Sequence, residues 1–188
     1  RYNDSIVPYM DINIKGNALY KNRLMMLDIL ANNDWKRPIY FSGGAFDDED
    51  YLWLKDYLQL DGMVYKLVPI KNTPSKDGGP MDMGQIDADK MYNIVMKWDW
   101  GNSESEKIYH DPETRRNSIT YRTNLSRLMN ELIAEGKNDK AKNIINLAMT
   151  KMPLDKFGYY SLVEPFAGGY YKVGETGKAH DLLDKLVN

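Results

Sequence analysis

The pattern of hydrophobic and polar positions differs between the two halves of the chain. Residues 17–31 place apolar side chains on several helical faces, which predicts a helix buried on more than one side. Residues 38–42 predict a short strand. Its proline stands at the first position, where no hydrogen bond between strands is lost, and two glycines end it. Residues 63–68 are rich in β-branched and aromatic side chains and predict a second strand, ended by Pro69.

A helix is expected between these two strands. Four consecutive acids at 47–50 suit the exposed amides of a first helical turn, and the helix is predicted to run to about Leu60. Strand, helix and strand with short connections predict a right-handed βαβ unit, whose strands at 38–42 and 63–68 are parallel neighbours. Residues 71–85 contain many glycines and prolines and predict a long loop.

Further helices are predicted from Asp87 onward. Asp87 is expected to cap one whose core side chains recur at helical spacing, namely Met91, Ile94, Val95 and Trp98. A second start signal is the sequence Asp111–Pro112–Glu113, with a capping acid and proline in the first turn. The helix that starts here has a row of core-facing side chains, namely Leu125, Leu128, Met129, Leu132 and Ile133. The chain beyond Asp111 is therefore predicted to be helical.

An internal repeat with a displacement of 38 residues is the most specific pattern in the helical half. The positions Gly136, Lys140, Ala141, Ile144, Ile145 and Ala148 recur as Gly174, Lys178, Ala179, Leu182, Leu183 and Leu186. In each copy a glycine ends one helix and a small alanine lets the next helix pack closely. Tetratricopeptide repeats use this arrangement with a period of about 34 residues. The repeat predicts stacked antiparallel hairpins that present a concave surface.

Together these patterns predict an α+β protein with two domains. Residues 1–105 are expected to form a small α/β unit that contains the βαβ motif. Residues 111–188 are expected to form a tetratricopeptide-like, antiparallel helical segment.

Composition narrows the classes of function. The chain has 25 basic and 27 acidic residues and a formal net charge of −2, which excludes nucleic acid as the expected partner. The absence of cysteine excludes disulfides, thiolate catalysis and cysteine-ligated metals. No apolar run is long enough for a transmembrane helix. Because the sequence starts at Arg1, we expect it to be part of a longer polypeptide.

The residues with catalytic or metal-binding chemistry form no complete motif. His110 and His180 are each the only histidine nearby, so both are interpreted as surface residues of helices. The acids at 47–50 lack the spacing of a calcium loop, and Ser42–Gly43–Gly44 lacks that of a phosphate-binding turn. We therefore predict no catalytic residue, no metal and no cofactor in this chain. Four arginines are interpreted as a solvated basic face, with lipid phosphates or an acidic partner surface as the alternative: Arg115, Arg116, Arg122 and Arg127.

Paired aromatic residues are the candidate binding residues, because they combine apolar area with a polar edge. They are Trp98, Trp100, Tyr159, Tyr160, Tyr170 and Tyr171. Tyr160 and Tyr171 are separated by about three helical turns, as are Tyr159 and Tyr170. If Pro165 and the following glycines leave the helix intact, one pair is expected to be exposed and the other to lie in the core.

Several segments resemble a known family. They are residues 22–30, 33–41 with the run Arg-Pro-Ile-Tyr-Phe, 57–62 with Tyr-Leu-Gln-Leu-Asp-Gly, 65–69, and 170–175 followed by Lys178–Ala179. They resemble the soluble C-terminal region of polytopic bacterial membrane proteins of unknown function, which are grouped with GT-C glycosyltransferases of the protein O-mannosyltransferase type.

The resemblance implies a non-catalytic accessory region of a membrane glycosyltransferase, used for acceptor or partner interaction. It implies a periplasmic location at the bacterial inner membrane, with attachment through upstream transmembrane helices. The expected partners are the membrane-embedded remainder of the same polypeptide and a protein or glycan acceptor. No catalytic residue is carried over, since the catalytic acid of such enzymes lies in an early loop.

Two alternatives from other classes remain open. An independent soluble enzyme, either a glycoside hydrolase or a nucleotide-binding protein, would have a pocket with convergent titratable groups. A cytosolic tetratricopeptide adaptor would have an open groove and no membrane-spanning parent.

Overall fold

The computed structural model describes residues 6–14, 17–42, 50–72 and 83–187. The chain forms two compact units, Arg1–Gln85 and Ile86–Asn188. This division falls about twenty residues before the boundary expected near residue 105, because helix α2 (Ala88–Val95) packs with helix α3 (Pro112–Ala134) in the second unit.

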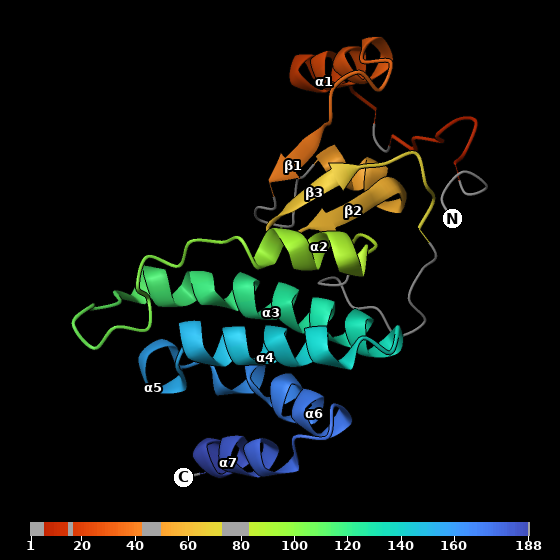
Figure 1. The fold of residues 1–188 in the computed structure, drawn as a ribbon. Helices are drawn as coiled ribbons and strands as arrows, with labels where there is room; N and C mark the ends of the chain where they lie inside the picture. Colours follow the sequence, from red (N-terminus) through yellow and green to blue (C-terminus); the bar gives the residue numbers. More distant parts are fainter. Residues whose placement is uncertain (1–5, 15–16, 43–49, 73–82, 188) are drawn as a thin grey trace. The chain divides into compact units, whose positions relative to one another are not determined.

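The first unit contains a three-stranded antiparallel sheet (Figure 1). Its strands are β1 (Tyr40–Ser42), β2 (Leu58–Asp61) and β3 (Val64–Leu67), in the order β1-β3-β2. Every residue of β2 is buried, and β3 alternates between half-buried and buried positions. With helices in both units, the chain has the predicted α+β class.

The predicted βαβ unit is wrong. β1 and β3 are neighbours, but they run antiparallel, with Phe41 opposite Tyr65. Between them the described chain forms a 3-10 helix, η2 (Asp50–Tyr57), and then β2 where the helix was expected to continue. β2 and β3 form a hairpin whose two-residue turn begins with Gly62, at a φ of 74°. Of the four acids at 47–50, only Asp50 lies among the described residues.

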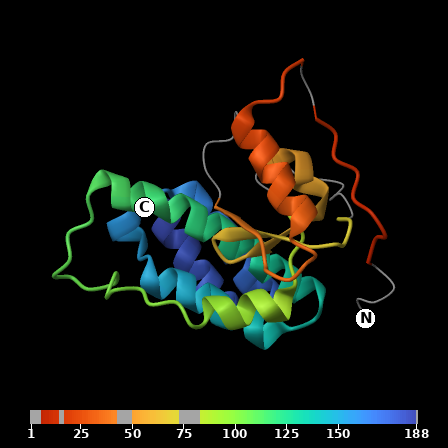
Figure 2. The same cartoon turned by 90° about the horizontal axis from the view of Figure 1, so that it is seen from above.

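Helix α1 (Lys21–Asn32) forms where a helix was expected, but its predicted burial is wrong. No residue of α1 is buried, and Leu24, Met25 and Ile29 are exposed. The helix lies next to η2 (Figure 2), where the guanidinium of Arg23 sits 5.3 Å from the ring centroid of Trp53. The unit therefore leaves an apolar helix largely uncovered.

The second unit is helical. After α2 and α3 come α4 (Asn138–Lys151), α5 (Leu154–Phe157), the 3-10 turn η3 (Tyr160–Leu162), α6 (Glu164–Lys172) and α7 (Thr176–Val187). Both predicted start signals are confirmed. The Asp87 carboxylate accepts a hydrogen bond from the Lys90 amide at 3.1 Å, and the Asp111 carboxylate accepts one from the Thr114 amide at 2.7 Å.

The predicted repeat forms two helical hairpins, α3–α4 and α6–α7 (Figure 1). At the first turn Gly136 has a φ of 73°, and at the second Gly174 has a φ of 81°. The next amide donates back to the helix end in each copy, from Lys137 to the Leu132 carbonyl and from Glu175 to the Tyr170 carbonyl, both at 2.8 Å. The hairpins thus share one turn geometry, which satisfies the carbonyls at both helix ends.

Candidate functional site

The two tryptophans of the candidate set form an aromatic cluster with Tyr121 of α3. The ring centroids of Trp98 and Trp100 are 5.6 Å apart, and they lie 5.5 and 5.7 Å from Tyr121. Both tryptophans are half-buried. Because the three rings pack edge to face or tilted against one another, they join the segment after α2 to α3 and leave part of their surface to solvent.

The four tyrosines do not share one helix. Tyr159 precedes η3 in a left-handed conformation, with a φ of 53°, whereas Tyr171 belongs to α6. Pro165 lies in the first turn of α6, so it begins this helix and does not kink a longer one. The condition of one intact helix from Tyr159 to Tyr171 is therefore not met, although the two glycines after Pro165 do lie within α6.

The four tyrosines differ in how far their side chains are exposed. Tyr160 and Tyr171 are exposed, at 55% and 42%. Tyr170 is buried, and its hydroxyl donates to the Asn146 side chain at 2.9 Å. Burial, with a smaller contribution from the Glu175 charge, raises the pKa of Tyr170. Tyr159 is exposed, so the pair Tyr159 and Tyr170 is not jointly in the core.

A charged cluster holds α2 to the first hairpin turn. The ammonium groups of Lys137 and Lys140 each donate to the Asp89 carboxylate at 2.6 Å. Hydrogen bonds from Lys137 and then from Lys140 lower the pKa of Asp89 from 3.8 to about 2. The ammonium of Lys140 also lies 5.2 Å from the ring centroid of Tyr92. Sequence reasoning missed Asp89 and Tyr92, which lie outside the repeat.

The second hairpin turn carries a corresponding cluster. The Lys142 ammonium lies 2.6 Å from the Glu175 carboxylate, and its hydrogen bond lowers the pKa of Glu175. Lys178, the repeat equivalent of Lys140, lies 5.7 Å from the ring centroid of Tyr170. Each hairpin thus places a lysine over a tyrosine ring, which belongs to α2 at the first turn and to α6 of the hairpin itself at the second.

Arg122 was predicted to lie on a solvated basic face, and this was wrong. Its side chain is fully buried, and its guanidinium donates to the carbonyls of Met152, at 2.8 Å, and of Gly158. These residues are the C-terminal caps of α4 and α5, where the helix dipoles favour a cation. Burial lowers the pKa of Arg122 to about 10. Its spacing of three residues from Leu125 was the signal that placed it on the core stripe.

The two histidines occupy different environments. A ring nitrogen of His110 lies 2.8 Å from the Ser103 carbonyl, and its ring packs on Phe157 with centroids 4.4 Å apart. His180 is exposed on α7 with its ring 5.6 Å from that of Tyr171. In the part of the chain that the structure describes, no group of three or more histidines and carboxylates could hold a metal ion.

An apolar cavity of about 360 Å³ lies in the first unit, between α1 and the sheet. Its lining combines side chains of α1, η2, β3 and the loops, and the residues are Met10, Ile12, Leu27, Leu30, Ala31, Asn33, Trp35, Ile39, Leu54 and Leu67. Asn33 is the one polar residue in this lining, and its amide donates to the Arg37 carbonyl at 2.9 Å. The described lining therefore offers apolar packing area, and none of its residues carries a charge.

The chain is thus an α+β protein of two units. The first holds an antiparallel sheet and the exposed helix α1, and the second holds two helical hairpins with aromatic residues at the surface. Compared with known families, residues 1–90 match the family described as TMEM260-associated domain 2. The first unit is thus similar to a domain linked to a membrane protein family. No curated protein and no solved structure matches the chain. Among the described residues, no helix is both long and apolar enough to cross a membrane.

Proposed function

We propose that this chain is a non-catalytic, extracytoplasmic accessory region of a membrane glycosyltransferase of the GT-C type. The match of residues 1–90 to a domain family named for its association with TMEM260 supports the membrane connection and carries the proposal. The glycosyltransferase assignment and the periplasmic location rest on the resemblance of the segments around Arg37 and Leu60. The partners are the membrane-embedded remainder of the polypeptide and its acceptor.

The second unit supplies the surface for this role. Tyr160 and Tyr171 are exposed, while the neighbouring Tyr170 anchors α6 through its hydrogen bond to Asn146. Exposed tyrosines on a rigid helical scaffold bind protein and carbohydrate surfaces at low cost in side-chain entropy. The charged clusters at both hairpin turns fix the scaffold that carries them.

The first test separates the accessory role from catalysis. The 188-residue chain is incubated with a lipid-linked sugar and acceptor, and in parallel the parent protein is assayed with and without this region. We expect no turnover by the chain alone, turnover by the parent, and weaker acceptor use when the region is deleted. Turnover by the chain alone, or a stoichiometric metal in elemental analysis, would overturn the proposal.

The second test addresses the tyrosine surface. The double substitution of Tyr160 and Tyr171 by alanine removes exposed side chains, so the melting temperature should change little. Capture of the purified membrane-embedded remainder of the polypeptide should become on the order of tenfold weaker, as for interface tyrosines elsewhere. The matched control is Tyr109→Ala, because Tyr109 is 83% exposed in the same unit. Equal capture by both variants would show that this surface does not bind.

A further inference from the structure

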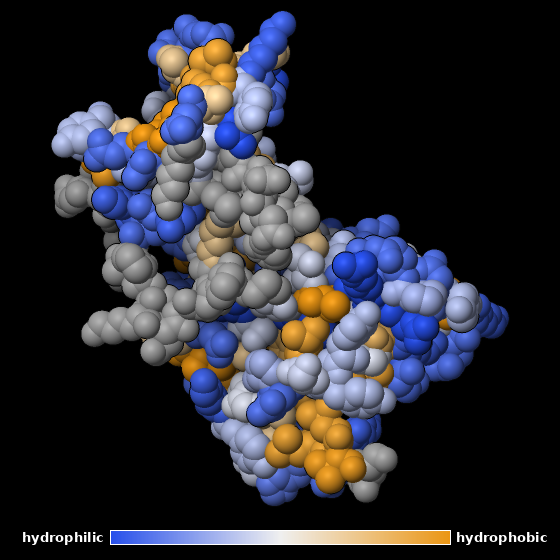
Figure 3. Space-filling view, turned by 180° about the vertical axis from the view of Figure 1, so that it is seen from behind, coloured by the Kyte–Doolittle hydropathy of each residue, from blue (hydrophilic) through white to orange (hydrophobic). Residues whose placement is uncertain are grey.

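Helix α1 carries apolar side chains on two opposite sides. Successive residues of an α-helix are about 100° apart, so Leu27, Leu30 and Ala31 share the face that lines the cavity. By the same spacing Met25 and Ile29 lie on the opposite face, where they are 58% and 59% exposed, together with the exposed Asn22 and Asn32. Figure 3 shows apolar side chains gathered over this helix, at the upper end of the view.

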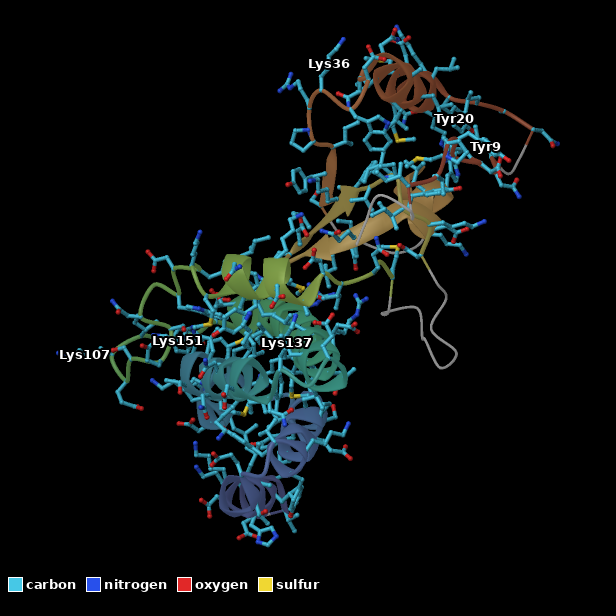
Figure 4. The ribbon with its side chains drawn as sticks, turned by 45° about the vertical axis from the view of Figure 1, so that its right-hand side comes forward. Tyr9, Tyr20, Lys36, Lys107, Lys137 and Lys151 are labelled. Atoms are coloured by element: carbon cyan, nitrogen blue, oxygen red, sulfur yellow. The ribbon has the colours of Figure 1, made fainter. Side chains whose placement is uncertain are left out.

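Aromatic and basic residues lie at both ends of α1, and one of them, Trp35, also lines the cavity. Tyr20, just before α1, is 65% exposed, and Trp35, in the loop after it, is 54% exposed. Exposed cations lie at both ends, namely Lys21, Lys36 and Arg37, and Lys36 forms an ion pair with Asp34 at 2.9 Å. Figure 4 shows Tyr20 beside the start of α1 and Lys36 in the loop beyond its end. Residues 17–42 contain four basic and two acidic residues, whereas the whole chain is net negative.

We propose that the outer face of α1 docks on an anionic lipid membrane and lies in the plane of its interface. Apolar side chains, a tyrosine and a tryptophan at the ends, and lysine and arginine around them are the residues that interfacial helices use. Positive charge in this segment complements the negative surface of anionic lipids. The inference rests on the proposed function only for the presence of a membrane nearby.

The geometry favours lying on the membrane over crossing it. α1 has 12 residues, so at about 1.5 Å per residue it is far shorter than the roughly 30 Å of a hydrocarbon core. The inner face of α1 already lines the cavity of the unit. The face that carries Met25 and Ile29 is therefore the one available to lipid. Docking would bury that face and leave Leu27 and Leu30 where they are.

The test is flotation of the 188-residue chain with vesicles. Vesicles of phosphatidylcholine with phosphatidylglycerol should bind the chain, and vesicles of phosphatidylcholine alone should bind it more weakly. Substituting Met25 and Ile29 by serine should weaken partitioning on the order of tenfold, through lost apolar burial. Substituting Lys21 and Arg37 by glutamine should reduce binding to anionic vesicles by about fivefold for each charge.

Controls make the outcomes decisive. Replacing Met96 and Val187 by serine removes two exposed apolar side chains from the second unit and should leave vesicle binding unchanged. Circular dichroism and sedimentation must show that all variants fold alike. The docking inference is overturned if the chain does not bind anionic vesicles, or if the serine pair at 25 and 29 abolishes a dimer instead. Failure of vesicle binding leaves the glycosyltransferase assays unaffected, so the two proposals fail separately.

Discussion

At the scale of single residues, two adjacent glycines in α6 meet different surroundings. A Cβ on Gly169 would lie 2.3 Å from the Sδ of Met129 and 3.1 Å from the Cδ1 of Ile145, and both of these side chains are buried. A Cβ on Gly168 would meet nothing within 4 Å. The absence of a side chain at Gly169 therefore allows α6 to approach the first hairpin closely.

This difference predicts opposite effects of the same substitution. Gly168→Ala should raise the free energy of unfolding by about 0.5–1 kcal/mol through helix propensity. Gly169→Ala gains the same propensity but overpacks Met129, which costs about 1–3 kcal/mol, so it should be the less stable variant. Urea unfolding of the two proteins measures the difference. Equal stability would mean that Met129 moves aside freely.

Arg122 is a second residue whose role depends on its surroundings. Its folded pKa of about 10 keeps it protonated at neutral pH, so the second unit buries a cation held by the carbonyls of Met152 and Gly158. Arg122→Met should lower the free energy of unfolding by about 2–4 kcal/mol, because these carbonyls lose their donors.

Two comparisons test this account of Arg122. The exposed Arg116→Met should change stability by less than about 0.5 kcal/mol. Arg122→Lys retains the charge but not the planar fork that reaches both helix ends, and should lie between the other two variants. If all three unfold at the same urea concentration, the helix ends do not depend on this side chain.

At the scale of elements, local signals were sufficient for the helices of the second unit that start at Asp87 and Asp111, but not for the sheet or for the helix expected between its strands. The caps at Asp87 and Asp111 and the two glycine turns involve neighbours within a few residues, so the sequence specifies them. Strand pairing is non-local, and the apolar segment before Asp61 suited a helix as well as a strand. Gly62, which opens the two-residue turn, was the available hairpin signal, and a turn of this length implies an antiparallel pair.

The link between α2 and the first hairpin turn gives a pH-dependent prediction. The pKa of Asp89 is about 2 in the folded chain and 3.8 ordinarily, so its contribution to stability is complete above about pH 4. It is lost as the pH falls through 2, and below that pH both states bind the proton. Asp89→Asn should therefore be less stable than the wild type at pH 6, and this difference should shrink steadily from about pH 4 to pH 2.

Chemical unfolding between pH 2 and pH 7 measures this difference. Because Asp89 is exposed, added salt should reduce it. The control is Asp181→Asn, which removes one negative charge from an exposed position on α7 and should leave the pH profile unchanged. A constant difference between Asp89→Asn and the wild type at every pH would rule out the ion pairs as its cause.

At the scale of the whole molecule, the candidate site was only partly predictable. The number and pairing of aromatic residues identified all six candidates, but only burial distinguishes Tyr170, which anchors α6, from the exposed Tyr171. Periodicity likewise identified α1 as apolar on several faces. It does not reveal which faces the rest of the chain covers, and for this reason the outer face of Met25 and Ile29 was predicted to be core.

The division into two units predicts how the whole chain unfolds. Leu60 in β2 and Ile144 in α4 are both fully buried, each within the core of its own unit. Truncating either one to alanine should cost about 2–5 kcal/mol, because each leaves a cavity. If each unit is held together by its own core, Leu60→Ala should lower one calorimetric transition and Ile144→Ala another. A single transition that shifts equally in both variants would show that the two units unfold as one.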